Sequence, residues 1–156
     1  RRYSQHSGGL FIYGDPSGSS RDTRSGSDDY RIIVRELASY GPRKRVMRQA
    51  PPVVRRAFFI NSILECEHQG ISILIDDRCT NTIADYMYCR EAADGTKQKT
   101  KEKDSNGRQV EKYGHTSDAN DYFLCAAFER EFMQLTRGTS GGDVATVSER
   151  FNTTRY

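Results

Sequence analysis

Three aspartates stand at positions where carboxylates could bind metal ions. Asp15 follows a short apolar run, Asp76 follows an aliphatic run, and Asp118 opens a helical pattern. Sites in open α/β sheets form beyond the carboxyl ends of strands, so Asp15 and Asp76 are expected to meet there. A helix that begins near Asp118, with Asp121 in the same stretch, would bring further acid to this cleft. Oxygen ligands suit Mg²⁺ or Mn²⁺, so the pattern predicts two such ions as cofactors.

A carboxylate cluster of this kind predicts hydrolysis of a phosphodiester. Two divalent ions about 4 Å apart activate a water molecule and stabilise the leaving oxygen. The catalytic candidates are therefore Asp15, Asp76 and Asp118, together with His115, which lies three residues before Asp118. Three crowded carboxylates repel one another when no cation is present. Metal binding and local order are therefore expected to be tightly coupled.

Each candidate also has a simpler interpretation. Asp15 precedes Pro-Ser-Gly and could be a turn residue, whereas Asp118 could serve only the dipole of its helix. Asp76 or the neighbouring Asp77 could cap the next helix. Side chains alternate along a strand, so these two carboxylates cannot both face one cleft in regular geometry. His115 could be a metal ligand, a proton shuttle or an exposed loop residue.

Composition and charge limit the classes of protein to consider. The 156 residues fit one domain, and 35% apolar with 29% charged residues indicates a compact centre with long polar loops. The net charge of +3 does not identify a polyanion binder, but basic residues gather in groups that could neutralise DNA phosphates. A solvated basic surface is the alternative for any one group. These groups are Arg43, Lys44, Arg45 and Arg48; Arg55 and Arg56; and Lys97, Lys99, Lys101 and Lys103.

Several other classes lack their sequence signals here. No apolar run approaches the roughly 20 residues of a membrane span, and no segment resembles a signal peptide. The four cysteines are not arranged in the CxxC pairs of zinc sites, and we expect them to be reduced. No GxxxxGK[ST] phosphate loop is present, so the chain is not expected to hydrolyse ATP unaided.

The beginning of the chain predicts a strand, a helix and a second strand. Residues 10–13 form a short apolar run that predicts a buried strand, and 17–27 predicts a mobile loop. A helix capped by Asp28 or its neighbour Ser27 should end near Gly41-Pro42. Residues 44–49 could form a further short strand.

The middle of the chain predicts a helix, a central strand and another helix. Pro51-Pro52 sets a helix start, and that helix is expected to end near Gly70. The aliphatic run 71–75 predicts a central strand buried on both faces. Thr80 or Asn81 could cap the helix that follows.

The last third predicts a hairpin and a long helix. Residues 90–114 are hydrophilic with two turn signals, which indicates a basic β-hairpin or a partly disordered loop. The longest helical pattern covers 117–135. We predict a flexible segment over 1–9, one folded domain over 10–135 and a disordered tail over 136–156.

Five short motifs follow one another along the chain. Each is weak evidence for a family when taken alone, but their order and spacing together are fairly specific. They are Tyr13-Gly14-Asp15-Pro16-Ser17-Gly18; Ser27-Asp28-Asp29-Tyr30; Pro51-Pro52-Val53 with Arg56, Asn61 and Leu64; Ile73-Leu74-Ile75-Asp76 with Arg78-Cys79; and His115-Thr116-Ser117-Asp118-Ala119 with Tyr122. Over 10–135 the chain resembles the nuclease domain of viral large terminase subunits, the DNA-packaging motor proteins of tailed bacteriophages. The resemblance implies a ribonuclease-H-like fold, with a central mixed β-sheet flanked by helices, and metal-dependent cleavage of double-stranded DNA with little sequence specificity.

The resemblance also implies roles for individual residues. Asp15 and Asp76 match strand-borne metal ligands, and Asp118 matches the metal-binding aspartate of a closing His-x-x-Asp element that includes His115. The family has a β-hairpin, expected to touch DNA or gate the site, at the place of the lysines over 97–103. The DNA-binding candidates are therefore Lys97, Lys99, Lys101, Lys103 and Arg56.

The expected partners follow from the same resemblance. They are double-stranded concatemeric DNA, the terminase ATPase domain (absent from this chain), the portal and the small terminase subunit, with no membrane involved. The expected place of action is the packaging motor in the host cytoplasm. Two alternatives remain open: a DNA-binding or motor-docking module that does not cut, and another ribonuclease-H-like nuclease such as a Holliday-junction resolvase.

Overall fold

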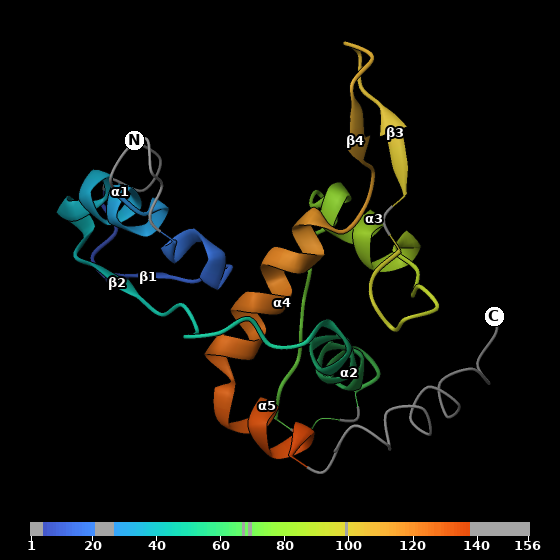
Figure 1. Ribbon diagram of the computed structural model, residues 1–156. Coiled ribbons are helices and arrows are strands. Elements are labelled where there is room, and N and C mark those ends of the chain that lie inside the picture. Colours follow the sequence, from blue (N-terminus) through green and yellow to red (C-terminus); the bar gives the residue numbers. More distant parts are fainter. Residues whose placement is uncertain (1–4, 21–26, 67, 69, 99, 138–156) are drawn as a thin grey trace.

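The computed structural model describes residues 5–20, 27–66, 68, 70–98 and 100–137. They form a mixed α/β arrangement of five α-helices and two small two-stranded sheets (Figure 1). The strands are β1 (Leu10–Ile12), β2 (Pro42–Lys44), β3 (Lys101–Lys103) and β4 (Gln109–Glu111). The helices are α1 (Asp29–Glu36), α2 (Val53–Leu64), α3 (Thr80–Tyr88), α4 (His115–Ala127) and α5 (Glu129–Thr136), with short 3-10 helices at Pro16–Ser19 and Ala38–Tyr40.

β1 and β2 form a parallel pair that α1 connects. Ile12 lies opposite Lys44, and the Arg45 N–H donates to the Ile12 carbonyl at 2.7 Å. Ile12 is buried, whereas Phe11 is half exposed. The strand predicted over 10–13 is therefore confirmed, but only one of its faces is covered. The second strand ends at Lys44, where the prediction had it begin.

α1 begins where the sequence indicates, but it ends at Glu36, before the predicted end near Gly41-Pro42. The Asp28 side chain accepts the Arg31 N–H at 2.9 Å and so satisfies a donor of the first turn that has no partner within the helix. The chain then passes through Ala38–Tyr40 to Gly41, whose φ of 58° is accessible to a residue without a side chain. Asp28 is thus confirmed as the cap.

α2, α4 and α5 pack around the main apolar core. Phe59 is 0% exposed, and its ring meets those of Phe132 and His68 edge-on, at centroid distances of 5.5 and 5.7 Å. In Figure 1, α4 runs through the middle of the molecule, with the β1–β2 pair and α1 on one side and α3 with the hairpin on the other. The buried members of the core are Phe59, Ile60, Ile63, Ile71, Leu124, Cys125 and Phe132.

The segment 71–75 belongs to no strand, which corrects the prediction of a central strand buried on both faces. Ile71 is buried in the helical core and Ile73 packs against it, but Leu74 is 96% exposed. β1 pairs with β2, so no central mixed sheet forms among the described residues. The physical reason is that an aliphatic run indicates that its side chains are buried, but it does not determine which strand, if any, its backbone pairs with. Here the helical core buries Ile71 and partly covers Ile73, while Leu74 stays exposed.

β3 and β4 form the antiparallel hairpin predicted within 90–114. The chain reverses at Asn106-Gly107, where Gly107 has a φ of 75°. The other turn signal, Asp94-Gly95, closes a separate small loop in which Glu91 is bridged to Lys97. The side chains of β3 are exposed, and the hairpin extends away from the helical core in Figure 1.

Two of the predicted helices have different boundaries. α2 ends at Leu64 rather than near Gly70, and Cys66 with a φ of 59° turns the chain out of the helical path. The last pattern begins two residues early, at His115, and Phe128 with a φ of −116° divides it into α4 and α5. The helical periodicity gave no indication of the bend at Phe128.

The ends of the chain lie largely outside the described residues. Residues 1–4 of the predicted flexible segment and 138–156 of the predicted disordered tail are not described. α5 ends at Thr136, next to the predicted domain boundary. In the part of the chain that the structure describes, we find no helix with the length and apolar character needed to cross a membrane.

Candidate functional site

A tight turn after β1 positions Asp15. Its side chain accepts the Ser17 N–H at 2.8 Å and caps the short 3-10 helix that follows. Tyr30 of α1 closes over the turn, and its hydroxyl donates to the Asp15 carbonyl at 2.7 Å. A Cβ added at Gly18 would lie 2.9 Å from the Tyr30 ring, and one at Gly14 would lie 2.5 Å from the Tyr30 hydroxyl. The two glycines therefore let Tyr30 hold the backbone of Asp15 in place.

The Asp15 carboxyl also interacts with Tyr122 of α4 and Arg56 of α2. Burial alone would raise the pKa of this carboxyl, but hydrogen bonds from its own turn and from Tyr122, with the charge of Arg56, hold the pKa below its usual value. Tyr13 packs edge-on against Phe123 at a centroid distance of 5.0 Å and so fixes the end of β1 to α4. Asp15 is both a turn residue and a member of a charged group.

An open hollow of about 380 Å³ adjoins Asp15 on the side of α1. Besides Asp15, its lining comes from the turn and from α1, with Tyr13, Ser17, Gly18, Asp29, Tyr30 and Ile33. A ligand could approach the Asp15 carboxylate through this hollow.

Arg56 lies between the carboxylates of two elements. It is 4% exposed, and its guanidinium carbon lies 4.2 Å from the centroid of the Tyr122 ring. Nη2 is 3.9 Å from Asp118 Oδ1, whereas Nε and Nη1 are buried without a hydrogen-bond partner among the described residues. A buried cation is costly unless opposite charges compensate it; Asp118 is the nearest such charge here, and Arg56 also helps to lower the pKa of Asp15. Arg56 thereby couples the end of β1 to the start of α4.

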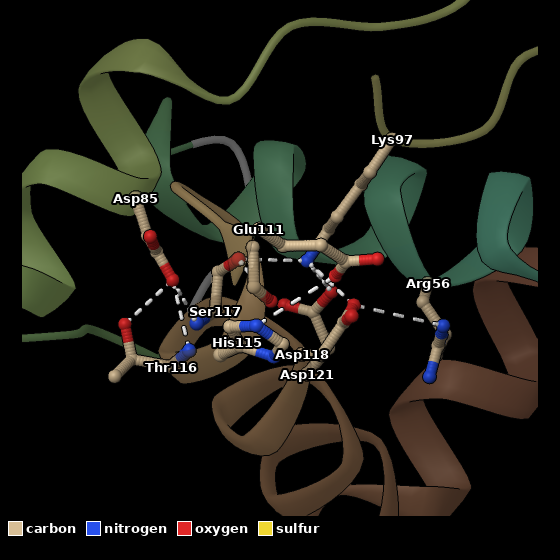
Figure 2. Close-up of polar contacts among 10 residues, drawn as sticks. Arg56, Asp85, Lys97, Glu111, His115, Thr116, Ser117, Asp118 and Asp121 are labelled. Atoms are coloured by element: carbon tan, nitrogen blue, oxygen red, sulfur yellow. Dashed lines mark hydrogen bonds and ion pairs between the residues drawn. The ribbon is translucent and has the colours of Figure 1, made fainter. Parts of the chain in front are cut away.

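Lys97 bridges two carboxylates at the start of α4 (Figure 2). Its Nζ lies 3.0 Å from Asp118 Oδ1 and 2.7 Å from Asp121 Oδ2, and it donates to Ser117 Oγ at 2.9 Å. Asp118 and Asp121 share a helix face because they are three residues apart. Burial raises the pKa of Asp121, although the charges of Lys97 and Arg56 oppose this effect. Three oxygens from one helix thus converge on a single cation.

Asp85 of α3 fixes the start of α4. Its Oδ2 accepts the Thr116 N–H at 2.8 Å, the Thr116 hydroxyl at 2.6 Å and the Ser117 N–H at 3.0 Å. Burial would raise the pKa of Asp85, but these hydrogen bonds outweigh burial and hold it below its usual value. The backbone donors belong to a first helical turn that has no internal partners. Asp85 therefore helps to set where Asp118 lies.

Asp76 is engaged elsewhere, by Arg78. The Arg78 guanidinium donates to it from Nε at 2.8 Å and from Nη2 at 2.7 Å, and the Arg78 backbone N–H donates at 3.0 Å. These hydrogen bonds hold the pKa of Asp76 below its usual range. Asp77, the alternative ligand, is exposed. Arg56 interacts electrostatically with both Asp15 and Asp118, whereas Asp76 makes its ion pair with Arg78.

His115 is the first residue of α4 rather than a loop residue. Its side chain is 70% exposed, and its Nε2 lies 3.7 Å from Glu111 Oε2 on β4. It stays a candidate for proton transfer or metal binding, one turn before Asp118.

The structure separates the predicted DNA-binding residues into two groups. Lys101 and Lys103 are exposed on β3. Lys97 and Arg56 instead face the carboxylates of α4, and Lys99 lies outside the described residues. DNA binding by any of them stays a prediction.

The oxygens around Lys97 have the chemistry of a hard-cation site. Ser117, Asp118 and Asp121 offer only oxygen donors, which Mg²⁺ and Mn²⁺ prefer. Over the described ranges, no group of three or more His, Cys, Asp or Glu side chains is arranged to hold a metal ion. The donor types therefore fit a divalent ion, but in this structure the Lys97 ammonium is the cation that contacts them. The two predicted ions stay a prediction.

Comparisons with protein-family models, with curated proteins and with solved structures found no match to this chain. The interpretation of the site therefore rests on its own residues.

Asp85 was not predicted from the sequence, and Asp121 was noted as a further acid near Asp118 but was not among the catalytic candidates. Asp121 could have been predicted as a site residue, because it lies three residues after Asp118 and residues three apart on a helix share a face. Asp85 had no local signal, since its partners lie 31 and 32 residues further along the chain. The contact of Lys97 with acids could not be read from its basic neighbourhood in the sequence.

Proposed function

We propose that this chain is a divalent-metal-dependent DNA endonuclease domain of the kind found in the large terminase subunits of tailed bacteriophages. One observation carries the proposal. Two carboxylates that are distant in sequence are linked to the buried Arg56: its Nη2 lies 3.9 Å from Asp118 Oδ1 at the start of α4, and its charge helps to lower the pKa of Asp15 after β1. Metal-assisted phosphodiester hydrolysis uses acids brought together from separate elements, and Asp15 also lines an open hollow that a substrate could enter.

In this proposal Asp15 and Asp118 hold the metal ions with a third carboxylate. Asp76 is the candidate from the sequence, and it would have to leave Arg78. Asp121 is the nearer candidate, because it shares Lys97 with Asp118. When bound, the divalent ions supply an activated water and neutralise charge that develops on the phosphodiester.

The basic residues of the chain provide the DNA contacts in this proposal. The exposed Lys101 and Lys103 of β3 hold the phosphate backbone, which gives affinity without base recognition. In this proposal the buried Arg56 helps to set the spacing of Asp15 and Asp118 through its positive charge. The substrate is double-stranded concatemeric DNA, and the partners are the terminase ATPase domain, the portal and the small subunit, in the host cytoplasm.

Incubation of the protein with supercoiled plasmid tests this function. We expect nicked and then linear DNA with Mn²⁺ or Mg²⁺, and no cleavage after chelation by EDTA. Four-way junctions and RNA–DNA hybrids, tested in parallel, should be cut more slowly than duplex DNA. A plasmid that stays supercoiled at saturating Mn²⁺ would contradict the proposal, and preferred cutting of the junction would point to a resolvase.

A module that binds DNA without cutting it is the second candidate, and one observation favours it. Lys97 and Arg56 already neutralise the acids at the start of α4, as a purely structural ion-pair group would. Such a module would retard DNA on a gel, with or without Mn²⁺, and leave every molecule intact.

A further inference from the structure

Lys97 is in an unusual environment for a lysine. Its side chain is 17% exposed, although lysine side chains usually remain in solvent. Its Nζ has three oxygens within 3.0 Å, those of Ser117, Asp118 and Asp121. In the described part of the chain, Asp121 Oδ2 is buried and makes no well-aligned hydrogen bond, so its ion pair with Lys97 is what compensates its charge. Lys97 thus occupies the place of a bound cation.

The lysine reaches this place from outside the helix that carries the acids. Lys97 lies in the loop between α3 and β3, just after the Asp94-Gly95 turn, whereas all three oxygens belong to α4. Figure 2 shows the extended Lys97 side chain entering the group from this loop. Its ammonium can therefore leave the acids without any unwinding of α4.

We infer that Lys97 is a built-in counter-cation, which occupies the cation position on Asp118 and Asp121 and must leave before a divalent metal ion binds there. The inference rests on the proposed metal-dependent function and adds a regulatory step to it. An ammonium and a divalent ion cannot share the same carboxylate oxygens, because like charges repel at this distance.

Calorimetric titration of the full chain with Mn²⁺ alone tests this inference. Lys97→Met keeps the aliphatic stem and removes the charge, so the variant is expected to bind Mn²⁺ at least about tenfold more tightly than the unsubstituted protein. Lys97→Arg keeps the charge and should bind about as weakly as the unsubstituted protein. The matched control is Lys112→Met, which removes an exposed lysine whose Nζ lies 3.1 Å from Glu102 Oε2.

Thermal unfolding gives an independent readout. Without metal, Lys97→Met should melt at a lower temperature than the unsubstituted protein, because Asp118 and Asp121 then repel each other. Added Mn²⁺ should raise its melting temperature by more than it raises that of the unsubstituted protein. If Lys97→Met does not fold, Lys97→Gln, which can still donate to Ser117, provides the same comparison.

Two results would overturn the inference. Only one of them would also contradict the proposed metal-dependent function. If the unsubstituted protein binds Mn²⁺ and Lys97→Met binds it equally or more weakly, Lys97 is not a competitor, while the proposed function stands. If neither protein binds Mn²⁺, the proposed metal-dependent function fails together with the inference.

Discussion

Asp118→Asn is expected to slow Mn²⁺-dependent nicking of supercoiled plasmid by at least about a hundredfold. Removing a residue that only hydrogen-bonds to a metal ligand typically costs about 10- to 100-fold in metal affinity or activity. Removing the charge of a ligand itself should therefore cost more. The amide keeps the size of the side chain, so the fold should be retained. Asp15→Asn should slow nicking to a similar extent. Its turn should be retained, because the amide oxygen can still accept the Ser17 N–H. Initial nicking rates at fixed Mn²⁺ concentration measure both effects.

Glu36→Gln is the matched control for these two variants. It removes one exposed carboxylate at the end of α1, whose partner is the neighbouring Arg35 at 3.1 Å. Its nicking rate should equal that of the unsubstituted protein. An Asp118→Asn variant that nicks within a few-fold of the unsubstituted protein would remove Asp118 from the catalytic site and favour its simpler role in the helix dipole.

Phe59→Ala should lower the free energy of unfolding by about 3–5 kcal/mol. Phe59 of α2 is fully buried, and its ring contacts those of Phe132 on α5 and of His68. The substitution removes apolar burial and leaves a cavity that neighbouring helices fill only in part. For a chain of this size the melting temperature should fall by roughly 10 °C. Urea denaturation followed by circular dichroism measures the change.

Phe11→Ala is the control for the core substitution. Phe11 is half exposed on β1, with the Arg45 guanidinium carbon 5.4 Å from its ring centroid. Its replacement should cost about 1 kcal/mol or less. Equal losses for the two variants would show that the α2–α4–α5 core does not dominate the stability of the chain.

Features that depend on neighbouring residues could be predicted from the sequence. Asp28 caps α1, Pro51-Pro52 leads into α2, and Asn106-Gly107 turns the hairpin. In each case the deciding chemistry lies within a few residues: a side-chain acceptor for a free N–H, a fixed φ, or a glycine with positive φ. The turn that holds Asp15 could be predicted from the sequence for the same reason.

Features that depend on distant partners could not be predicted in this way. The run 71–75 gave no indication that helices would bury its isoleucines and that no strand would pair with it. Asp76 was expected at a sheet edge, but without that sheet its nearest strong partner is Arg78. Lys97 belongs to a basic segment, and only the fold shows that its charge meets Asp121. Pairing across the chain decided each of these outcomes.

A crystal soaked in Mn²⁺ tests the central claim most directly, through the anomalous scattering of the metal. The proposed function predicts Mn²⁺ with carboxylate oxygens of Asp15 and Asp118 within about 2.0–2.4 Å. The further inference predicts that the Lys97 ammonium has then moved away from Asp118. The third carboxylate in the density would distinguish Asp76 from Asp121. A structure at saturating Mn²⁺ without metal at either Asp15 or Asp118, and with Lys97 still on Asp118, would contradict the account.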